Sequence, residues 1–182
     1  QGKGRAVERG VFEARGRYVL FTDADGATPI AELDKLLAAV GERAEIAIGS
    51  RRLVSAEAQR ERTGLRQLMG SVFYSVVNFL AVPGIRDTQC GFKLFRTDVA
   101  RELFRDLNES GWAFDVELLY RAQLFGYGIA EVPVNWHEVA GSKVNPLKDA
   151  LRMFLAIFRI RRRNAGLLRH PLAGPAATAG AQ

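Results

Sequence analysis

The distribution of apolar and polar residues along the chain predicts an α/β protein. Short apolar runs rich in aromatic and β-branched residues are typical of buried strands, and we expect them at residues 18–21, 45–50 and 92–95. Residues 128–136 alternate like an edge strand, a position that tolerates Pro133. Because a strand, a helix and a second strand follow one another between residues 18 and 50, we expect a right-handed crossover and a parallel sheet.

Apolar residues at helical spacing predict that the segments around these strands are helices. The predicted helices cover residues 3–15, 29–40, 65–82 and 98–107, a segment from about 111 to 126, and a last segment from 146. Thr28 and Thr97 stand where an N-cap is needed, and Pro29 fits a first helical position. A chain of 182 residues suits one domain with a substantial core.

Asp23 and Asp25 directly follow the first predicted strand. Side chains at i and i+2 of an extended chain point to the same side, so both carboxylates are expected to face one point beyond the carboxyl end of that strand. Ligands bind at that end in open α/β sheets, and two carboxylates that leave room for phosphate oxygens suit a divalent ion such as Mg²⁺. The alternative is a tight turn, because Asp caps its own backbone and Gly26 accepts a positive φ.

Other polar groups stand at the ends of predicted elements. Gly2-Lys3-Gly4 enters a helix and offers N–H groups and a cation to a phosphate, although a simple loop also explains it. Residues 87–89 (Asp, Thr, Gln) form an unusually polar loop before a predicted strand. Asp115 and Glu117 would lie about 200° apart on a helix and would not share one target, and an N-cap is the alternative for Asp115.

The net charge of +6 indicates anionic partners. Arginines cluster at residues 51–52, 60–66 and 159–163, and the candidate partners are a nucleotide, a phosphorylated lipid, an anionic membrane or a nucleic acid. The chain lacks the interleaved aromatic and basic strand pattern of single-strand binders, which argues against a nucleic acid. Cys90 is the single cysteine, which excludes an intrachain disulfide and fits a cytosolic setting.

The last predicted helix is amphipathic and basic at its end. Its apolar stripe consists of Leu147, Leu151, Phe154, Leu155 and Phe158. This pattern is typical of a helix in a membrane interface, and a helix docked on its own domain is the alternative. No apolar run is long enough to span a bilayer, and the Ala-, Gly- and Pro-rich residues 165–182 are expected to be disordered.

Several separated motifs occur in an order that matches one enzyme family. They are Gly2-Lys3-Gly4 with Ala6, Val7 and Gly10, then Ala14-Arg15-Gly16, Thr22-Asp23-Ala24-Asp25, Gly49-Ser50-Arg51, Asp87-Thr88-Gln89-Cys90-Gly91-Phe92-Lys93, Phe114-Asp115-Val116-Glu117-Leu118 and Gly141-Ser142-Lys143-Val144. The set resembles the polyprenyl-phosphate branch of the family 2 glycosyltransferases. It is most similar to the dolichyl-phosphate β-glucosyltransferases, with the dolichyl-phosphate mannose synthases as relatives, and the resemblance extends to about Arg163.

The resemblance implies a GT-A type α/β fold, with a mixed, mainly parallel sheet flanked by helices. It also implies an inverting transfer of a sugar from a nucleotide diphosphate to the phosphate of a membrane polyprenol. By resemblance, Asp23 and Asp25 would meet the nucleotide and a Mg²⁺ or Mn²⁺ ion. Lys3 would lie near the nucleotide, and Lys143 would lie in a loop that touches the phosphates.

The resemblance also assigns the remaining candidate site residues. Arg51, Asp87 and Gln89 would shape the site for the donor sugar and the acceptor. Asp115 falls where a catalytic or sugar-binding acid is expected, so Asp115 and Asp87 are the candidate catalytic residues. For both, holding the sugar is favoured over base catalysis, because the acceptor phosphate is largely deprotonated near neutral pH.

The chain departs from the family pattern at its start, where the strands that read the base and ribose are expected. We therefore expect a fragment, with a partial GT-A domain at residues 1–145, a basic amphipathic helix at 146–164 and a tail at 165–182. UDP-glucose is the expected donor and GDP-mannose the alternative. A non-catalytic, membrane-associated nucleotide-binding module is the alternative of another class, and the expected location is the cytoplasmic face of a membrane.

Overall fold

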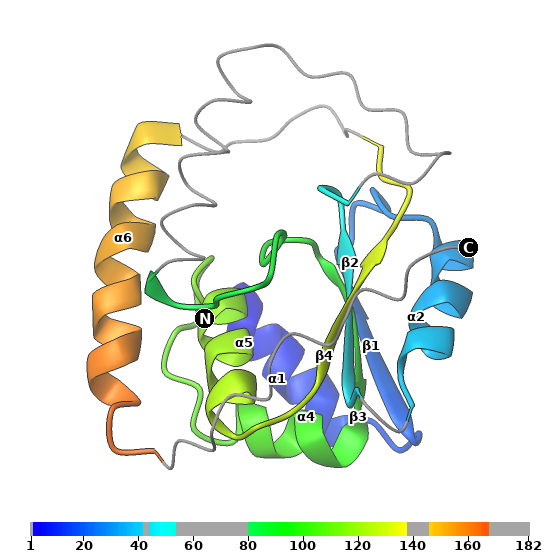
Figure 1. The fold of residues 1–182 in the computed structure, drawn as a ribbon, viewed down its shortest axis with the longest axis horizontal. Helices are drawn as coiled ribbons and strands as arrows, with labels where there is room; N and C mark the ends of the chain where they lie inside the picture. Colours follow the sequence, from blue (N-terminus) through cyan, green and yellow to red (C-terminus); the bar gives the residue numbers. More distant parts are fainter. Residues whose placement is uncertain (1, 42–43, 54–79, 138–145, 168–182) are drawn as a thin grey trace.

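The computed structural model describes residues 2–41, 44–53, 80–137 and 146–167, and its centre is a four-stranded mixed sheet (Figure 1). In spatial order the strands are β1 (Tyr18–Thr22), β3 (Phe92–Arg96), β2 (Ile46–Ser50) and β4 (Ile129–Pro133). β2 is parallel to β4, whereas β3 runs antiparallel to both of its neighbours, β1 and β2. The four predicted strands are confirmed, but β1 and β2 do not pair directly, because β3 lies between them.

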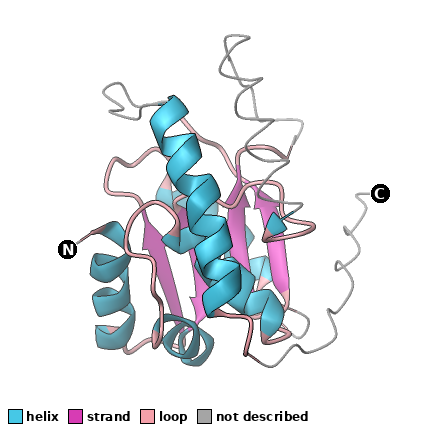
Figure 2. Ribbon diagram, turned by 90° about the vertical axis from the view of Figure 1, so that its left-hand side faces the viewer, coloured by secondary structure: helices cyan, strands magenta, loops and turns pink. Residues whose placement is uncertain are grey.

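Helices cover both faces of the sheet (Figures 1 and 2). They are α1 (Lys3–Glu13), the 3-10 turn η1 (Ile30–Glu32), α2 (Leu33–Ala39), α4 (Thr97–Phe104), α5 (Phe114–Leu124) and α6 (Pro146–Arg163). α2 covers one face, α1, α4 and α5 cover the other, and α6 packs outside α5. Most of the helix predicted over residues 65–82 and most of the predicted tail lie outside the described residues.

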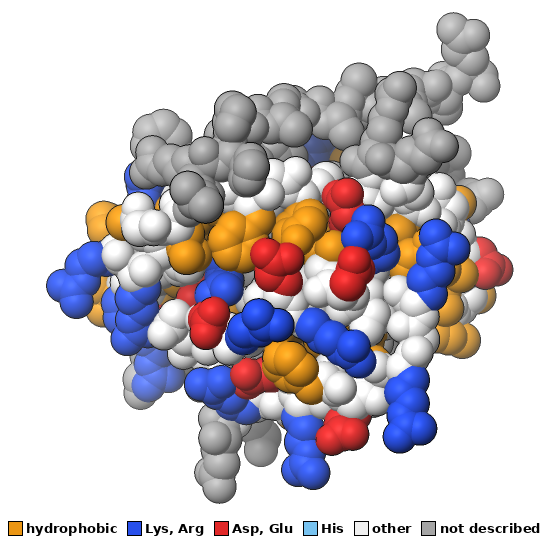
Figure 3. All heavy atoms as spheres, turned by 90° about the horizontal axis from the view of Figure 1, so that it is seen from below, with side chains coloured by type: hydrophobic (Ala, Val, Ile, Leu, Met, Phe, Trp, Pro, Cys, Tyr) orange, Lys and Arg blue, Asp and Glu red, His pale blue; other side chains and the backbone are white. Residues whose placement is uncertain are grey.

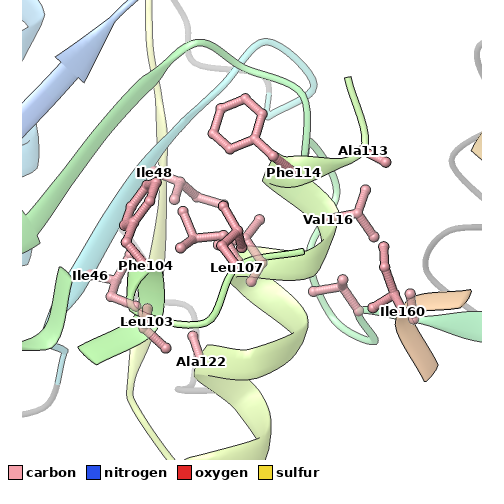
Figure 4. Packing of buried hydrophobic residues seen from close by; sticks show 14 of the residues in the cluster. Ile46, Ile48, Leu103, Phe104, Leu107, Ala113, Phe114, Val116, Ala122 and Ile160 are labelled. Carbon is pink, nitrogen blue, oxygen red and sulfur yellow. The ribbon is translucent and has the colours of Figure 1, made fainter. Parts of the chain in front are cut away.

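Hydrophobic side chains form one cluster on each face of the sheet. The larger cluster lies between the sheet and the α1, α4, α5 and α6 helices, and includes Ile48, Phe104 and Phe114 (Figure 4). The smaller cluster lies beneath α2 and includes Leu36 and Phe92. All five residues of β2 are buried, as expected for a strand that is covered on both faces. This packing holds the ends of β1, β2 and β3 in fixed relative positions.

Two predicted helix caps are wrong. Thr97 is the first residue of α4, and its hydroxyl donates a hydrogen bond to the carbonyl oxygen of Gly16 at 2.7 Å, instead of capping the helix. η1 begins after Pro29, whose backbone is extended, so Pro29 takes the N-cap position expected for Thr28. The Thr97 hydroxyl joins residues far apart in the sequence, and a local pattern does not reveal such a contact.

The α6 helix docks through a face other than the predicted stripe. The docked residues lie one turn apart and are Met153, Ala156, Ile157 and Ile160. Phe154, Leu155 and Phe158, from the predicted stripe, are 41, 50 and 52% exposed. The rings of Phe154 and Phe158 pack edge to face with centroids 5.0 Å apart. The side chains of Leu147 and Leu151 lie outside the described part of the chain.

Charges of both signs share the face of the molecule drawn in Figure 3. Lys and Arg side chains are interspersed there with Asp and Glu, and apolar side chains lie between them. Arg96 and Asp98 form an ion pair between accessible side chains, and its nitrogen and oxygen are 2.6 Å apart. Among the described helices, none combines the length and the apolarity that crossing a membrane requires.

Candidate active site

Segments from several parts of the chain meet beyond the carboxyl ends of β1 and β2. Asp23 follows β1, and Arg51 follows β2. Because β3 runs antiparallel to both strands, the loop before it, residues 87–91, reaches the same edge of the sheet. The N-termini of α1 and α5 arrive there too, since the Lys3 ammonium lies 5.7 Å from the ring centroid of Phe114. We call this group of residues the candidate active site.

Lys3 and Asp23 form an ion pair at the accessible side of this site. The Lys3 Nζ and Asp23 Oδ1 atoms are 2.5 Å apart, and the two side chains are 30 and 35% exposed. The same ammonium lies 5.6 Å from the ring centroids of Phe21 and Trp112. The Asp23 N–H donates a hydrogen bond to the Gly91 carbonyl oxygen at 2.8 Å. An accessible cation therefore stands beside an accessible carboxylate whose backbone is fixed to the 87–91 loop.

Asp25 lies in a tight turn just after Asp23. Its Oδ1 accepts a hydrogen bond from the Ala27 N–H at 3.1 Å, and Gly26 has a φ of +67°, which glycine adopts without steric cost. The turn that was the alternative to a metal site is thus present. Asp25 is nevertheless exposed, so the turn leaves its carboxylate accessible.

The carboxylates of Asp23 and Asp25 fit a metal ion that also takes ligands from a substrate. Over the described ranges of the chain, no group of three or more His, Cys, Asp or Glu side chains could hold a metal ion. Mg²⁺ is usually held by one or two carboxylates together with waters and substrate phosphates, so two carboxylates are enough for such an ion. The site is therefore suited to an ion that arrives with a phosphorylated ligand.

Arg51 and Asp87 form a second, largely buried ion pair. Arg51 Nε and Nη2 donate to the two oxygens of Asp87 at 2.8 and 2.9 Å, and the Arg51 N–H donates to Asp87 Oδ2 at 2.9 Å. The Asp87 N–H in turn donates to Glu131 at 2.7 Å, and the Arg51 guanidinium lies 5.5 Å from the Trp136 ring centroid. Burial alone would raise the pKa of Asp87, but the hydrogen bonds and charge of Arg51 hold it below its usual value.

The rest of the 87–91 loop brings one polar group and one glycine to the site. The Gln89 side-chain nitrogen is buried and has no hydrogen-bond partner among the described residues, so it is a donor available to a ligand. Gly91 leaves space for the carboxylate of Asp23, which a Cβ at residue 91 would overlap. Burial raises the pKa of the intervening Cys90 thiol to about 11, and the thiol is therefore not a nucleophile at neutral pH.

Asp115 is held inside the molecule by Lys93. It is the second residue of α5, whose N-cap is Ala113, so the capping alternative is wrong. The Lys93 Nζ and Asp115 Oδ1 atoms are 2.5 Å apart, and the side chains are 0 and 3% exposed. Burial raises the pKa of Asp115, and the charge of Lys93 opposes that rise. Glu117 binds backbone N–H groups of the loop before α5 instead, which confirms that the two acids do not share a target.

The structure thus brings most of the predicted site residues to one edge of the sheet. Lys3 contacts Asp23, and Arg51 contacts Asp87, while Lys143 lies outside the described residues. Sequence reasoning assigned no role to Lys93, although it stands in a quoted motif, and did not single out Trp112. Lys93 was detectable, because it occupies an inward position of a buried apolar strand, where a lysine needs a partner. Trp112 is 60% exposed beside the Lys3 ammonium, and no pattern singles it out.

Comparison with known sequences finds one family match and several similar proteins. Residues 1–104 match the family described as Glycosyl transferase family 2. The chain is 44% identical over 169 residues to the dolichyl-phosphate β-glucosyltransferase of Homo sapiens, covering 90% of this chain and 52% of that protein. It is 45% identical over 166 residues to the enzyme of the same name from Drosophila melanogaster, covering 88 and 51%. The chain therefore spans about half the length of these curated relatives.

Comparison with solved structures supports the predicted fold class. Glucosyl-3-phosphoglycerate synthase from Mycobacterium tuberculosis, in complex with Mn²⁺, UDP-glucose and phosphoglyceric acid, superposes with a TM-score of 0.62 at 19% identity. The match covers 92% of this chain and 56% of the synthase. A complex of the same synthase with Mg²⁺ and UDP gives a TM-score of 0.57, also at 19% identity. The GT-A type fold, a mixed sheet flanked by helices, is confirmed.

Proposed function

Since the chain belongs to glycosyl transferase family 2, we propose that the protein carrying it transfers glucose from UDP-glucose to a polyprenyl phosphate such as dolichyl phosphate. The observation that carries the proposal is the meeting of the Lys3–Asp23 and Arg51–Asp87 pairs with Asp115 at one edge of the sheet. Cations and carboxylates together suit a reaction between two phosphorylated molecules, because the cations hold the phosphates and the carboxylates hold hydroxyls or a metal ion.

The proposed reaction is a single displacement with inversion. An oxygen of the acceptor phosphate bonds to the anomeric carbon of glucose, the bond from that carbon to the diphosphate breaks, and UDP leaves with its electron pair. The second pKa of a phosphate monoester is near 6, so the nucleophile is already ionised at neutral pH. The main tasks of the protein are to bring two polyanions together and to stabilise the charge on the leaving diphosphate.

The cations of the site divide these tasks. Lys3 and its ion-pair partner Asp23 are both partly accessible, so the Lys3 ammonium can turn toward a phosphate of the donor. Arg51 is held in a fixed orientation by Asp87 and Trp136, so it places a positive charge at a fixed point of the site. Both oxygens of Asp87 are occupied by Arg51, and this contact favours a positioning role for Asp87 over that of a base.

The remaining groups are proposed to hold the donor. Asp23 and Asp25 would hold Mg²⁺ or Mn²⁺, which acts as a Lewis acid toward the diphosphate when bound. The unpaired Gln89 nitrogen would donate a hydrogen bond to the donor or the acceptor. Asp115 would accept a hydrogen bond from a sugar hydroxyl, and Lys143 is proposed to touch the phosphates.

The outward face of α6 supports action at a membrane surface, which we propose to be the cytoplasmic face. Phe154, Leu155 and Phe158 are exposed together on this face, although an apolar cluster of this kind is normally covered. Arginines follow on the next turns, among them Arg162, which is exposed. Apolar side chains beside basic ones are the pattern by which a helix lies in the interface of an anionic membrane. Such a position would bring the site to its lipid acceptor.

Donor selection tests the proposal. The longest natural reading frame containing this chain would be expressed in membranes and supplied with dolichyl phosphate, Mg²⁺, and labelled UDP-glucose or GDP-mannose in separate reactions. We expect lipid-soluble label from UDP-glucose only. Label from GDP-mannose only would replace glucose by mannose in the proposal. Label from neither donor, with folded protein present, would favour a non-catalytic nucleotide-binding module.

A further inference from the structure

Lys93 is a fully buried lysine at the centre of the candidate active site. Its side chain is 0% exposed. Lys93 lies on β3 directly opposite Phe21 of β1, and Phe21 stands two residues before Asp23 in the chain. Its ammonium also lies 5.1 Å from the ring centroid of Phe21. Lysine is almost never fully buried unless it is paired, because moving a charge out of water is costly. A lysine at this place therefore needs a reason beyond packing.

The contacts of Lys93 join two separate parts of the site. Its Nζ is 2.5 Å from Asp115 Oδ1 on α5, and also 2.5 Å from the carbonyl oxygen of Cys90 in the 87–91 loop. The residue after Cys90 is Gly91, whose backbone holds Asp23. One ammonium thus connects the N-terminus of α5 to the loop on which Asp23 rests.

We infer that Lys93 is a positioning residue for glycosyl transfer, which fixes the Asp115 carboxylate in its place at the edge of the sheet. This inference rests on the proposed function and gives a role to Lys93, which ends one of the family motifs but was not among the expected site residues. Asp115 lies deeper than Asp23, and both Lys3 and Asp23 are close enough to influence its charge. Without the ammonium, the buried Asp115 carboxylate would lose its ion pair with Lys93 and would turn toward Lys3 and the open side of the site.

A purely stabilising ion pair is the competing explanation, and it predicts a different set of results. Replacing a buried pair by apolar groups often leaves stability unchanged or improves it, so stability alone does not account for a pair at this position. If Lys93 only supports the fold, its loss lowers the amount of folded enzyme but leaves the turnover of each folded molecule intact. If Lys93 positions Asp115, turnover falls in the folded molecules as well.

The test measures kcat and KM for UDP-glucose in the longest natural reading frame that contains this chain, per folded molecule, for Lys93→Met, Asp115→Asn and the double variant. We expect Lys93→Met to lower kcat by at least about tenfold, as is typical for residues that orient a ligand-binding group, with KM changed much less. We also expect the double variant to turn over no more slowly than Asp115→Asn, because Lys93 acts through Asp115.

Glu117→Gln is the matched control, because Glu117 is also a fully buried carboxylate on α5 but points to the loop before that helix. It should lower the melting temperature and leave kcat per folded molecule unchanged. Two results would overturn the inference while leaving the proposed function intact. One is a wild-type kcat in the Lys93→Met enzyme. The other is a double variant whose kcat lies below that of Asp115→Asn by the same factor that Lys93→Met alone causes. A wild-type enzyme that transfers no glucose would refute the proposed function and the role of Lys93 with it.

Discussion

Replacing Gly91 by alanine would displace the carboxylate of Asp23. A methyl group at residue 91 would lie 2.5 Å from Asp23 Oδ1 and closer still to Cγ and Oδ2, whereas ordinary van der Waals contact begins at 3.4 Å. Oδ1 alone would have to move by about 0.9 Å, and the closer Cγ and Oδ2 atoms would have to move farther. Because the Asp23 side chain is 35% exposed, it can move toward solvent, and the fold is expected to survive the substitution.

The expected loss of activity follows from that displacement. A misplacement of about 1 Å can lower an enzymatic rate by roughly a hundredfold, which corresponds to about 2.7 kcal/mol of activation free energy. We expect Gly91→Ala to lower glucose transfer to dolichyl phosphate by about this factor. The weakened step should also need a higher Mn²⁺ concentration for half-maximal rate, since Asp23 is one of the two proposed metal ligands.

The assay counts labelled glucose in the lipid phase over a series of Mn²⁺ concentrations. Gly10→Ala is the matched control, because a Cβ at Gly10 would meet nothing within 4 Å. Gly10 lies within α1, where alanine is favoured over glycine by roughly 0.5–1 kcal/mol, so this variant should be as active as the wild type and slightly more stable. A folded Gly91→Ala enzyme with the wild-type rate and metal dependence would refute the placement of Asp23.

Three further predictions concern stability, membrane binding and thiol reactivity. Asp87→Asn removes the partner of the buried Arg51 and should cost about 3 kcal/mol of unfolding free energy in urea at pH 7. Folding lowers the pKa of Asp87, so the difference in unfolding free energy between the wild type and Asp87→Asn should disappear at low pH. The loss should begin below the pKa of Asp87 in the unfolded chain and end as the pH passes through its pKa in the folded protein. A constant difference down to pH 2 would contradict the pairing of Asp87 with Arg51. The double substitution Phe154→Ser and Phe158→Ser should lower the affinity for anionic vesicles, measured by co-sedimentation, by more than about tenfold, with an unchanged melting temperature. Unchanged vesicle binding would exclude this face of α6 as the membrane contact. Burial raises the pKa of Cys90 to about 11, so this thiol should react with maleimide about a hundredfold more slowly than a free thiol. The contribution of the protonated thiol to stability is present below about pH 9 and should be lost as the pH rises through 11. Rapid labelling of Cys90 in the native protein would contradict its burial.

The local pattern of apolar and polar residues was sufficient to predict the helices and strands that bury a single, regularly spaced set of apolar residues. The apolar run of β1 and the helical spacing in α1 identified both elements within two residues at each end. The convergence of Asp23 and Arg51 was also predictable, because the carboxyl ends of parallel strands lie at one edge of a sheet. These predictions needed only the period of the pattern and the direction of the chain.

Contacts between distant segments were not predictable in the same way. The insertion of β3 between β1 and β2 depends on strand pairing across more than forty residues, which no local period records. The α6 helix carries apolar residues on two faces, and only the packing against α5 decides that Ile157 is buried while Phe158 is exposed. The inward position of Lys93 indicated that it needs a partner, but the sequence did not show which one, because Asp115 lies twenty-two positions away on another element.

The most direct test of the account is the transfer of labelled glucose from UDP-glucose to dolichyl phosphate by the longest natural reading frame that contains this chain, measured with and without EDTA. Asp23→Asn and Asp25→Asn would be measured beside the wild type. We expect lipid-soluble glucose from the wild-type protein, its loss with EDTA, and its recovery when Mg²⁺ or Mn²⁺ is restored in excess. We expect little transfer by either variant. Metal-independent transfer, or full activity in both variants, would contradict the assignment of this edge of the sheet as the active site.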